Sequence, residues 1–143
     1  MAQDAIAMRY LAIDYGLKQT GLAICDPTET FCSPLSVIVG QNGLLEKIVE
    51  MVKAEGIGGI VMGLPLNMDD SAGPQAKLVT QFTEQLKKLI EVPVYFQDER
   101  LSTFAAKEKL AGTELTRGKK KKRLDAIAAA EILSAFLEQK HAQ

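Results

Sequence analysis

The order of its apolar segments is the feature that most constrains how this chain folds. Three short apolar runs come first, and short apolar runs then alternate with longer segments that carry apolar residues every three or four positions. Neighbouring strands with short connections pair antiparallel, whereas strands separated by a helix are parallel, with right-handed crossovers. The expected strands are Met8–Ile13, Gly21–Cys25, a segment within Phe31–Val39, Ile57–Met62 and Val92–Phe96.

The longer segments predict helices that pack against this sheet. They cover Gly43–Glu55 with Asn42 as its cap and Gly56 as its end, Gly73–Ile90, Ser102 to about Gly112, and about Lys120 to Glu138. The pattern predicts an α/β fold with a five-stranded mixed sheet, three antiparallel strands followed by two parallel ones, and helices on both faces. We expect one domain over residues 8–143, preceded by a loose extension, residues 1–7.

Composition and cysteine content exclude several classes of protein. Apolar residues make up 47% and charged residues 24% of the 143 residues, as in ordinary globular domains, and no apolar run is long enough to cross a bilayer. We therefore expect a cytoplasmic protein without a membrane partner. Cys25 and Cys32 match no zinc-binding spacing, and the only histidine, His141, lies in the tail. Two buried thiols are expected, and neither a zinc site nor a Cys–His nucleophile pair.

Positive charge is concentrated in one short segment. The net charge of the chain is −1, yet residues 117–123 read Arg-Gly-Lys-Lys-Lys-Lys-Arg. The rest of the chain is therefore acidic, and the asymmetry favours a polyanionic partner. A solvated loop would show the same run of lysines, but this run comes directly before Asp125.

Acidic residues follow the strands where a ligand crevice is expected. Asp14 ends the first strand and begins a turn with Gly16 and Gly21, two residues that tolerate backbone angles penalised by a Cβ. Asp98 and Glu99 follow the last strand. In sheets of this kind the carboxyl ends of the strands form the ligand crevice, so these acids should meet at one edge. Asp14 could equally be an ordinary turn residue.

The third acid comes from the last helix. Asp125 precedes Ala128, Ala129 and Ile132 by three, four and seven residues, which places it on the core-facing stripe. A carboxylate directed toward the sheet needs a partner. Capping of its own helix, or an ion pair with Arg100 or Arg123, are the alternatives.

Three converging carboxylates predict a divalent metal site. Asp14, Glu99 and Asp125 would repel one another unless a cation neutralised them, and oxygen ligands select Mg²⁺ or Mn²⁺. A pair of such ions, held ~3.5–4 Å apart, serves phosphodiester cleavage without a protein nucleophile. The basic run would bind the nucleic-acid backbone, and Tyr15 and Phe104 could stack on bases.

Four motifs, taken together, resemble the YqgF family, also called RuvX, of bacterial Holliday-junction-resolvase-like proteins with a ribonuclease H-like fold. The resemblance covers Met8 to about Leu137. The motifs are Asp14-x-Gly16-x4-Gly21, Gly63-Leu64-Pro65-Leu66-Asn67, Asp98-Glu99-Arg100-Leu101-Ser102-Thr103 and Leu124-Asp125-Ala126-Ile127-Ala128-Ala129.

The resemblance implies a cytoplasmic nuclease that matures the 5′ end of the small-subunit ribosomal RNA precursor. It implies that Asp14, Glu99 and Asp125 are the catalytic, metal-holding acids. The residues expected to contact substrate, from the resemblance or from the charge pattern, are Gly16, Lys18, Gly63, Pro65, Asn67, Arg100, Lys119, Lys120, Lys121, Lys122 and Arg123.

Other functions fit parts of the pattern. Branched DNA fits a two-metal site as well as RNA does. A non-catalytic nucleic-acid-binding factor could keep the fold without the chemistry. An actin-like ATPase or sugar kinase also opens with Asp-x-Gly, but needs two such domains, and 143 residues hold one. The sequence does not distinguish a monomer from a weak dimer.

Overall fold

The computed structural model describes residues 8–69, 71–99 and 117–142, with side chains from Asp125 onward in the last range. The extension expected over residues 1–7 and the helix expected from Ser102 to Gly112 lie outside the described residues, as does Phe104. The elements, in chain order, are β1 (Tyr10–Asp14), β2 (Gln19–Cys25), β3 (Cys32–Val39), α1 (Leu44–Ala54), β4 (Gly59–Leu64), α2 (Pro74–Lys87), β5 (Val94–Asp98) and α4 (Arg117–His141).

The five strands form one mixed sheet in the order β3-β2-β1-β4-β5. β1 pairs antiparallel with β2, and β2 with β3, whereas β1 pairs parallel with β4, and β4 with β5. The predicted fold class is therefore confirmed. Pro34 lies in the edge strand β3, next to a shift in pairing register between Leu22 and Ala23, where a missing N–H is tolerated.

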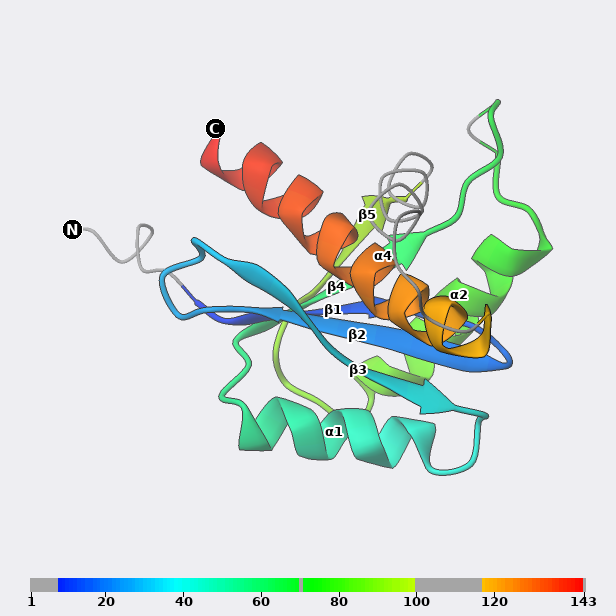
Figure 1. Cartoon of the computed structure of the whole chain (residues 1–143), viewed down its shortest axis with the longest axis horizontal. Coiled ribbons are helices and arrows are strands. Elements are labelled where there is room, and N and C mark those ends of the chain that lie inside the picture. Colours follow the sequence, from blue (N-terminus) through cyan, green and yellow to red (C-terminus); the bar gives the residue numbers. More distant parts are fainter. Residues whose placement is uncertain (1–7, 70, 100–116, 143) are drawn as a thin grey trace.

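Helices cover both faces of the sheet (Figure 1). Alternate residues of each strand pack on opposite faces of the sheet. In β1, Leu11 and Ile13 pack with α1 and α2, whereas Tyr10 and Ala12 pack with α4. The α4 layer is rich in alanine, with Ala12, Ala23, Ala129 and Ala130 all buried. Small side chains on both surfaces let α4 lie close to the sheet.

Several predicted boundaries need correction. β1, β4 and β5 each begin two residues later than predicted and extend far enough to include Asp14, Leu64 and Asp98. Ile57 and Gly58, predicted to begin β4, instead donate their N–H groups to the carbonyl oxygens of Val52 and Arg9. Ile57 therefore closes the end of α1, and Gly58 joins the chain to the residue before β1.

The helix ends also differ in detail from the prediction. Asn42 is not the cap of α1: Gly43 occupies that position at φ 70°, without a capping side chain. Gly56 ends the helix at φ 63°, as predicted. α2 ends at Lys87 rather than at Ile90, and Leu89, which falls within the predicted helix but beyond the observed one, is 51% exposed.

The ends of α4 lie beyond those predicted. It begins at Arg117, so the basic run belongs to the helix rather than to a loop before it, and it ends at His141. His141 is not in a frayed tail, because its Nε2 lies 3.1 Å from Glu29 Oε1. Cys25 is buried as predicted, but Cys32 is only half-buried, and neither forms a disulfide. Among the described helices, none is long and apolar enough to cross a membrane.

Candidate active site

A row of three residues crosses the middle of the sheet on the α4 face. Asp14 ends β1, and its partner in β2 is Gly21. The parallel pairing of Ile13 with Met62 places Gly63 of β4 on the other side of Asp14. Asp14 shares its face with Ala12, which packs in the α4 layer. The carboxylate therefore stands between two glycines, and each glycine receives one of the other predicted acids.

Gly21 is the place where α4 meets the sheet. An ideal Cβ on Gly21 would lie 2.1 Å from the carbonyl oxygen of Asp125 and 2.4 Å from its carbonyl carbon. No side chain fits there, because the opposing atoms belong to helix backbone. The backbone freedom that glycine allows is not used at Gly16 or Gly21, since neither has a positive φ. Close approach is the reason for glycine at position 21, and it fixes Asp125 beside Asp14.

Gly63 makes room for the second acid. An ideal Cβ on Gly63 would lie 2.3 Å from Glu99 Oε2 and 2.7 Å from Ile132 Cδ1 of α4. The Glu99 carboxylate thus lies over β4, and the Glu99 N–H donates to the Leu64 carbonyl oxygen at 3.3 Å. The end of β5 and the end of β4 together direct Glu99 toward Asp14.

The electrostatics show how closely the acids approach. Burial raises the pKa of Asp14 to about 8, helped by the charge of Glu99, a hydrogen bond shared with Glu99, and the charge of Asp125. Burial also raises the pKa of Glu99, to which the charge of Asp98 contributes, although the bond to Asp14 opposes it. Two carboxyl groups can share a hydrogen bond only if one holds a proton. Without a cation, the site therefore retains a proton between Asp14 and Glu99.

The donor set fits a hard divalent cation. All three side chains offer oxygen, the ligand atom that Mg²⁺ and Mn²⁺ prefer. In the described part of the chain, no three His, Cys, Asp or Glu side chains are yet arranged to hold a metal ion. Asp125 acts on Asp14 through its charge, whereas Glu99 is hydrogen-bonded to it. The alternative ion pairs of Asp125 with Arg100 or Arg123 involve side chains outside the described residues.

The turn after Asp14 is held by a residue that sequence reasoning missed. Gln41 donates from Nε2 to the carbonyl oxygens of Gly16 and Leu17, at 2.9 and 3.0 Å, and accepts from the Tyr15 hydroxyl at 2.9 Å. The Tyr15 ring stacks on Phe82 of α2, with ring centroids 4.3 Å apart, rather than standing free for a base. Both Gly16, which is half-buried, and Lys18, which is exposed, belong to this turn.

The predicted substrate loop after β4 is held mainly by its own residues. Leu66 and Ala72 form an isolated antiparallel bridge. Asn67 donates from its backbone to the Ser71 carbonyl oxygen at 2.9 Å and from Nδ2 to Ser71 Oγ at 3.0 Å. Pro65 is half-buried between this loop and β4. Asn67 thus shapes the loop, and Gly63 belongs to the strand rather than to the loop.

The predicted basic contacts can be placed only in part. Arg100 lies outside the described residues. The run from Lys119 to Arg123 lies in the first turns of α4, on the same helix as Asp125, but its side chains are outside the described set.

Gln97 of β5 is a buried polar residue beside the site that was not predicted: it is 7% exposed and pairs with Gly63. Its position directly after the strand predicted over Val92–Phe96 offered no signal that it would be buried.

Comparison with known proteins gives consistent matches. A family model described as RuvX, Holliday junction resolvase, matches residues 8–139. A Roseiflexus sp. (strain RS-1) protein that bears the name "Putative pre-16S rRNA nuclease" is 38% identical over 132 residues, covering 91% of this chain and 94% of its own. A protein of the same name from Caldanaerobacter subterraneus subsp. tengcongensis is 39% identical over 134 residues, covering 92% and 96%.

Solved structures share the fold at low sequence identity. Thermus thermophilus RuvC in complex with a Holliday junction substrate superposes with a TM-score of 0.57 at 14% identity, covering 93% of this chain and 96% of that one. The fowlpox virus resolvase in complex with Holliday junction DNA gives a TM-score of 0.56 at 13% identity, covering 93% and 99%. Both therefore support a ribonuclease H-like architecture.

Proposed function

Since this chain belongs to the RuvX family of Holliday junction resolvases and is a nuclease, we propose that it hydrolyses phosphodiester bonds with divalent metal ions held by Asp14, Glu99 and Asp125. The single observation that supports these roles is the row Gly21–Asp14–Gly63, where the two glycines admit Asp125 and Glu99 to either side of Asp14. Two backbone positions are kept clear so that three acids can meet. A solvated turn carboxylate would need neither glycine.

The raised pKa of Asp14 supports the same assignment. Burial and two neighbouring acids make its ionised form costly in the metal-free protein. Strongly perturbed carboxylates in a crevice are typical of functional sites. A bound Mg²⁺ or Mn²⁺ pair would activate the attacking water and stabilise the leaving oxygen. Asp14, Glu99 and Asp125 are the residues that would hold these ions.

The beginning of α4 supports a nucleic-acid substrate. Residues 117–123 place six positive charges at the N-terminal end of the helix, and no acid lies in its first turn. The helix dipole is already positive there, so these charges favour an anion. At 1.5 Å per residue, Arg123 and Lys119 precede Asp125 by about 3 and 9 Å along the axis. We infer that this segment holds the phosphate backbone while the acids act on it.

We propose that the substrate is the 5′ end of the small-subunit ribosomal RNA precursor and that the protein acts in the cytoplasm. The support is the shared name of the relatives that match over nine-tenths of this chain. The family model is described by Holliday junction resolution instead. Branched DNA is therefore the alternative substrate, and the two nucleic acids must be compared directly.

The test is cleavage of a precursor RNA and of a four-way DNA junction by the parent protein and by Asp14→Asn, each with Mn²⁺ and with EDTA. The proposal expects cleavage of the RNA by the parent with Mn²⁺ and none by Asp14→Asn. Cleavage of the junction alone would replace the substrate but keep the chemistry. Equal cleavage by Asp14→Asn, or cleavage in EDTA, would refute the assignment of the acids.

A further inference from the structure

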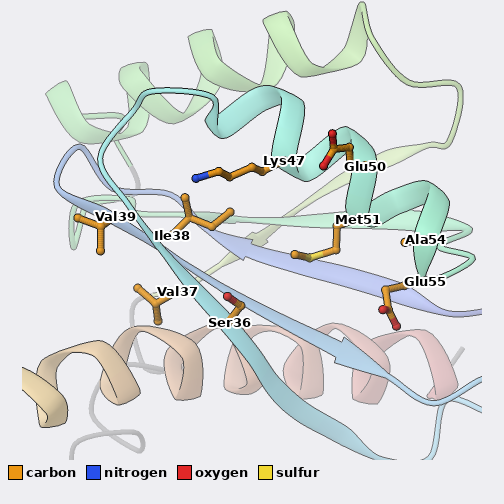
Figure 2. A pocket seen from close by; sticks show the side chains of 9 residues that line it. All are labelled: Ser36, Val37, Ile38, Val39, Lys47, Glu50, Met51, Ala54 and Glu55. Carbon is orange, nitrogen blue, oxygen red and sulfur yellow. The ribbon is translucent and has the colours of Figure 1, made fainter.

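A groove lies between the edge strand β3 and helix α1, on the face of the sheet opposite to α4 (Figure 2). Its volume is about 600 Å³, and it is lined by Ser36–Val39 of β3 and by α1 residues. The α1 lining is Lys47, Glu50, Met51, Ala54 and Glu55. Among the described strands, β3 has a neighbour on one side only, because it is the last strand of the sheet.

The hydrogen-bond register shows which backbone groups of β3 face outward. Gly40 donates its N–H to the Lys18 carbonyl oxygen at 2.8 Å, so this pair is a hydrogen-bonded one. The same antiparallel register pairs Ile38 with Thr20 and Ser36 with Leu22. In antiparallel sheets, bonded and non-bonded residues alternate, so Ile38 and Ser36 face β2. Val37 and Val39 therefore direct their N–H and C=O groups away from the sheet.

This half of the edge lacks the features that normally prevent strand pairing. The first half of β3 carries Pro34 and the register shift, two devices that block a new strand. Residues 36–39 contain no proline, no charge and no bulge, and Val39 is 62% exposed. Unprotected edges of this kind recruit another extended strand.

We propose that this edge and groove bind a second copy of the chain, with β3 pairing antiparallel to β3 about a twofold axis near Val37. The groove carries charges suited to such symmetry. Lys47 and Met51 of α1 and the C-cap residue Glu55 follow at intervals of four, with Lys47 toward the Val39 end and Glu55 at the other end, beyond Met51 (Figure 2). Glu50, the third charged residue of the lining, lies next to Met51, so the two copies of Glu50 would lie near the axis and weaken the attraction. A twofold axis reverses the direction, so Lys47 of each copy faces Glu55 of the other, with Met51 between them.

The interaction is weak and reversible. Two outward bonds at Val37 and a narrow groove give a contact at the low end of specific interfaces, which bury more than about 1,200 Å². Glu55 already lies 3.4 Å from the Arg9 guanidinium, so Lys47 of the second copy adds a charge to an existing pair. The dimer therefore forms at high protein concentration and dissociates on dilution.

The pairing leaves the proposed nuclease sites independent. The Val39 end of β3 lies at the same edge of the sheet as Asp14, since Val39 pairs with Gln19 and Asp14 with Gly21. In an antiparallel pair these edges point in opposite directions. Each site is therefore free to act on its own substrate, and dimer-breaking variants should keep the cleavage rate per chain.

Sedimentation of the full chain over a range of concentrations tests the backbone contact. The parent should shift from monomer to dimer as concentration rises. Val37→Pro removes the outward N–H while leaving the bonds to β2, and should shift the transition at least tenfold in concentration. Val37→Thr keeps the N–H and a similar shape, and should behave as the parent. A parent that stays monomeric to about 1 mM, a concentration at which even very weak pairing is visible, would overturn the proposal.

Cross-linking tests the register without relying on a proline variant that folds. In a Cys32→Ser background, Val37→Cys places the two thiols opposite each other, with Cα atoms about 5.5 Å apart in a bonded pair, within disulfide range. Val39→Cys is more exposed but lies two residues from the axis, so it should cross-link far less. Equal cross-linking at both positions would mean random collision and would refute the register.

A charge reversal tests the groove. Lys47→Glu should weaken association several-fold, with an effect that diminishes at high salt. Lys53→Glu makes the same change on the same helix, outside the groove lining, and is the matched control. Equal effects of the two variants would show that net charge, rather than the groove, governs association.

Discussion

Two carboxylates that lie near opposite ends of α4, one buried and one half-buried, have pKa values shifted in opposite directions. Glu29 is 4% exposed, and at the C-terminal end of the helix its oxygens receive Lys140 Nζ at 2.7 and 2.8 Å and the Met8 N–H at 2.7 Å. Burial raises its pKa, but Lys140, the Met8 N–H and His141 outweigh burial, and the pKa lies below its ordinary value. Asp14 faces two other acids, and its pKa is raised.

The difference separates a structural acid from a chemical one. Glu29 joins the N-terminal segment, the β2–β3 connection and the end of α4, and it holds a left-handed backbone at φ 61° to do so. A buried charge with hydrogen-bonded partners stabilises a fold only while its partners remain. Asp14 is instead repelled by the charges of Glu99 and Asp125, and a bound cation or a proton reduces that repulsion. Substitutions should therefore affect stability at Glu29 and cleavage at Asp14.

The largest expected effect is loss of cleavage at the acids. Asp14→Asn, Glu99→Gln and Asp125→Asn should each lower the cleavage rate about 10³-fold, the scale of losing one preorganised electrostatic group in an active site. Their free energies of unfolding should be unchanged or higher, because each removes a like charge. Single-turnover cleavage with Mn²⁺ and thermal unfolding of the same samples check both halves. A variant that loses cleavage because it unfolds would not support the role.

A substitution beside the acids should act through position alone. Gly63→Ala places a Cβ 2.3 Å from Glu99 Oε2, so the carboxylate must move. Displacing a catalytic group by about 1 Å can cost about 10²-fold in rate. Gly58→Ala is the control, because its Cβ meets only the side chain of Met8, at 3.2 Å. Equal cleavage rates for the two variants would mean that Glu99 need not lie over β4.

Glu29→Gln should have the opposite profile. It keeps the shape of the side chain but leaves the Lys140 ammonium without its carboxylate, which we expect to cost about 2 kcal/mol, less than a fully buried pair because Lys140 is 31% exposed. For a chain of this size the melting temperature should fall by about 7 °C. Cleavage per folded molecule should stay at the parent rate. Glu84→Gln, on the exposed face of α2, should change neither quantity.

The sequence predicted the acids because their positions follow from chain order. Strands separated by a helix are parallel, so the residues after β1 and β5 share one sheet edge, and Asp125 precedes an apolar stripe that must face the sheet. Gly21 and Gly63 are visible in the sequence, but the sequence alone does not show why these positions must be glycine. Gly21 and Gly63 are small because Asp125 and Glu99 approach them, and such contacts exist only after α4 and β5 have docked.

Other features needed contacts between distant segments. Glu29 binds Lys140, 111 residues away, and also contacts His141. Because these contacts join distant parts of the chain, the sequence alone predicted His141 only as a residue of the tail. Asn42 is a good helix cap by residue type, but Gly43 takes the cap position because the chain turns there at positive φ. Local preference predicts which elements form, whereas docking decides which residue ends them.

The pH dependence of stability should reveal both carboxylates in one measurement. In metal-free protein with EDTA, the pKa of Asp14 rises from 3.8 to about 8. The stability it gives is fully present below its unfolded pKa and is lost as pH rises toward 8. The pKa of Glu29 is lowered from 4.5, so its contribution is present above that value and is lost as pH falls through its folded pKa.

The melting temperature of the metal-free protein should therefore decline by a few degrees from about pH 5 to pH 8. Asp14→Asn should flatten that decline and leave the acid side unchanged, whereas Glu29→Gln should flatten the acid side only. Millimolar Mg²⁺ or Mn²⁺ should restore stability at pH 8 in the parent but not in Asp14→Asn, because the cation takes the place of the proton. A parent whose melting temperature rises between pH 5 and pH 8 without metal would contradict the repulsion inferred at Asp14.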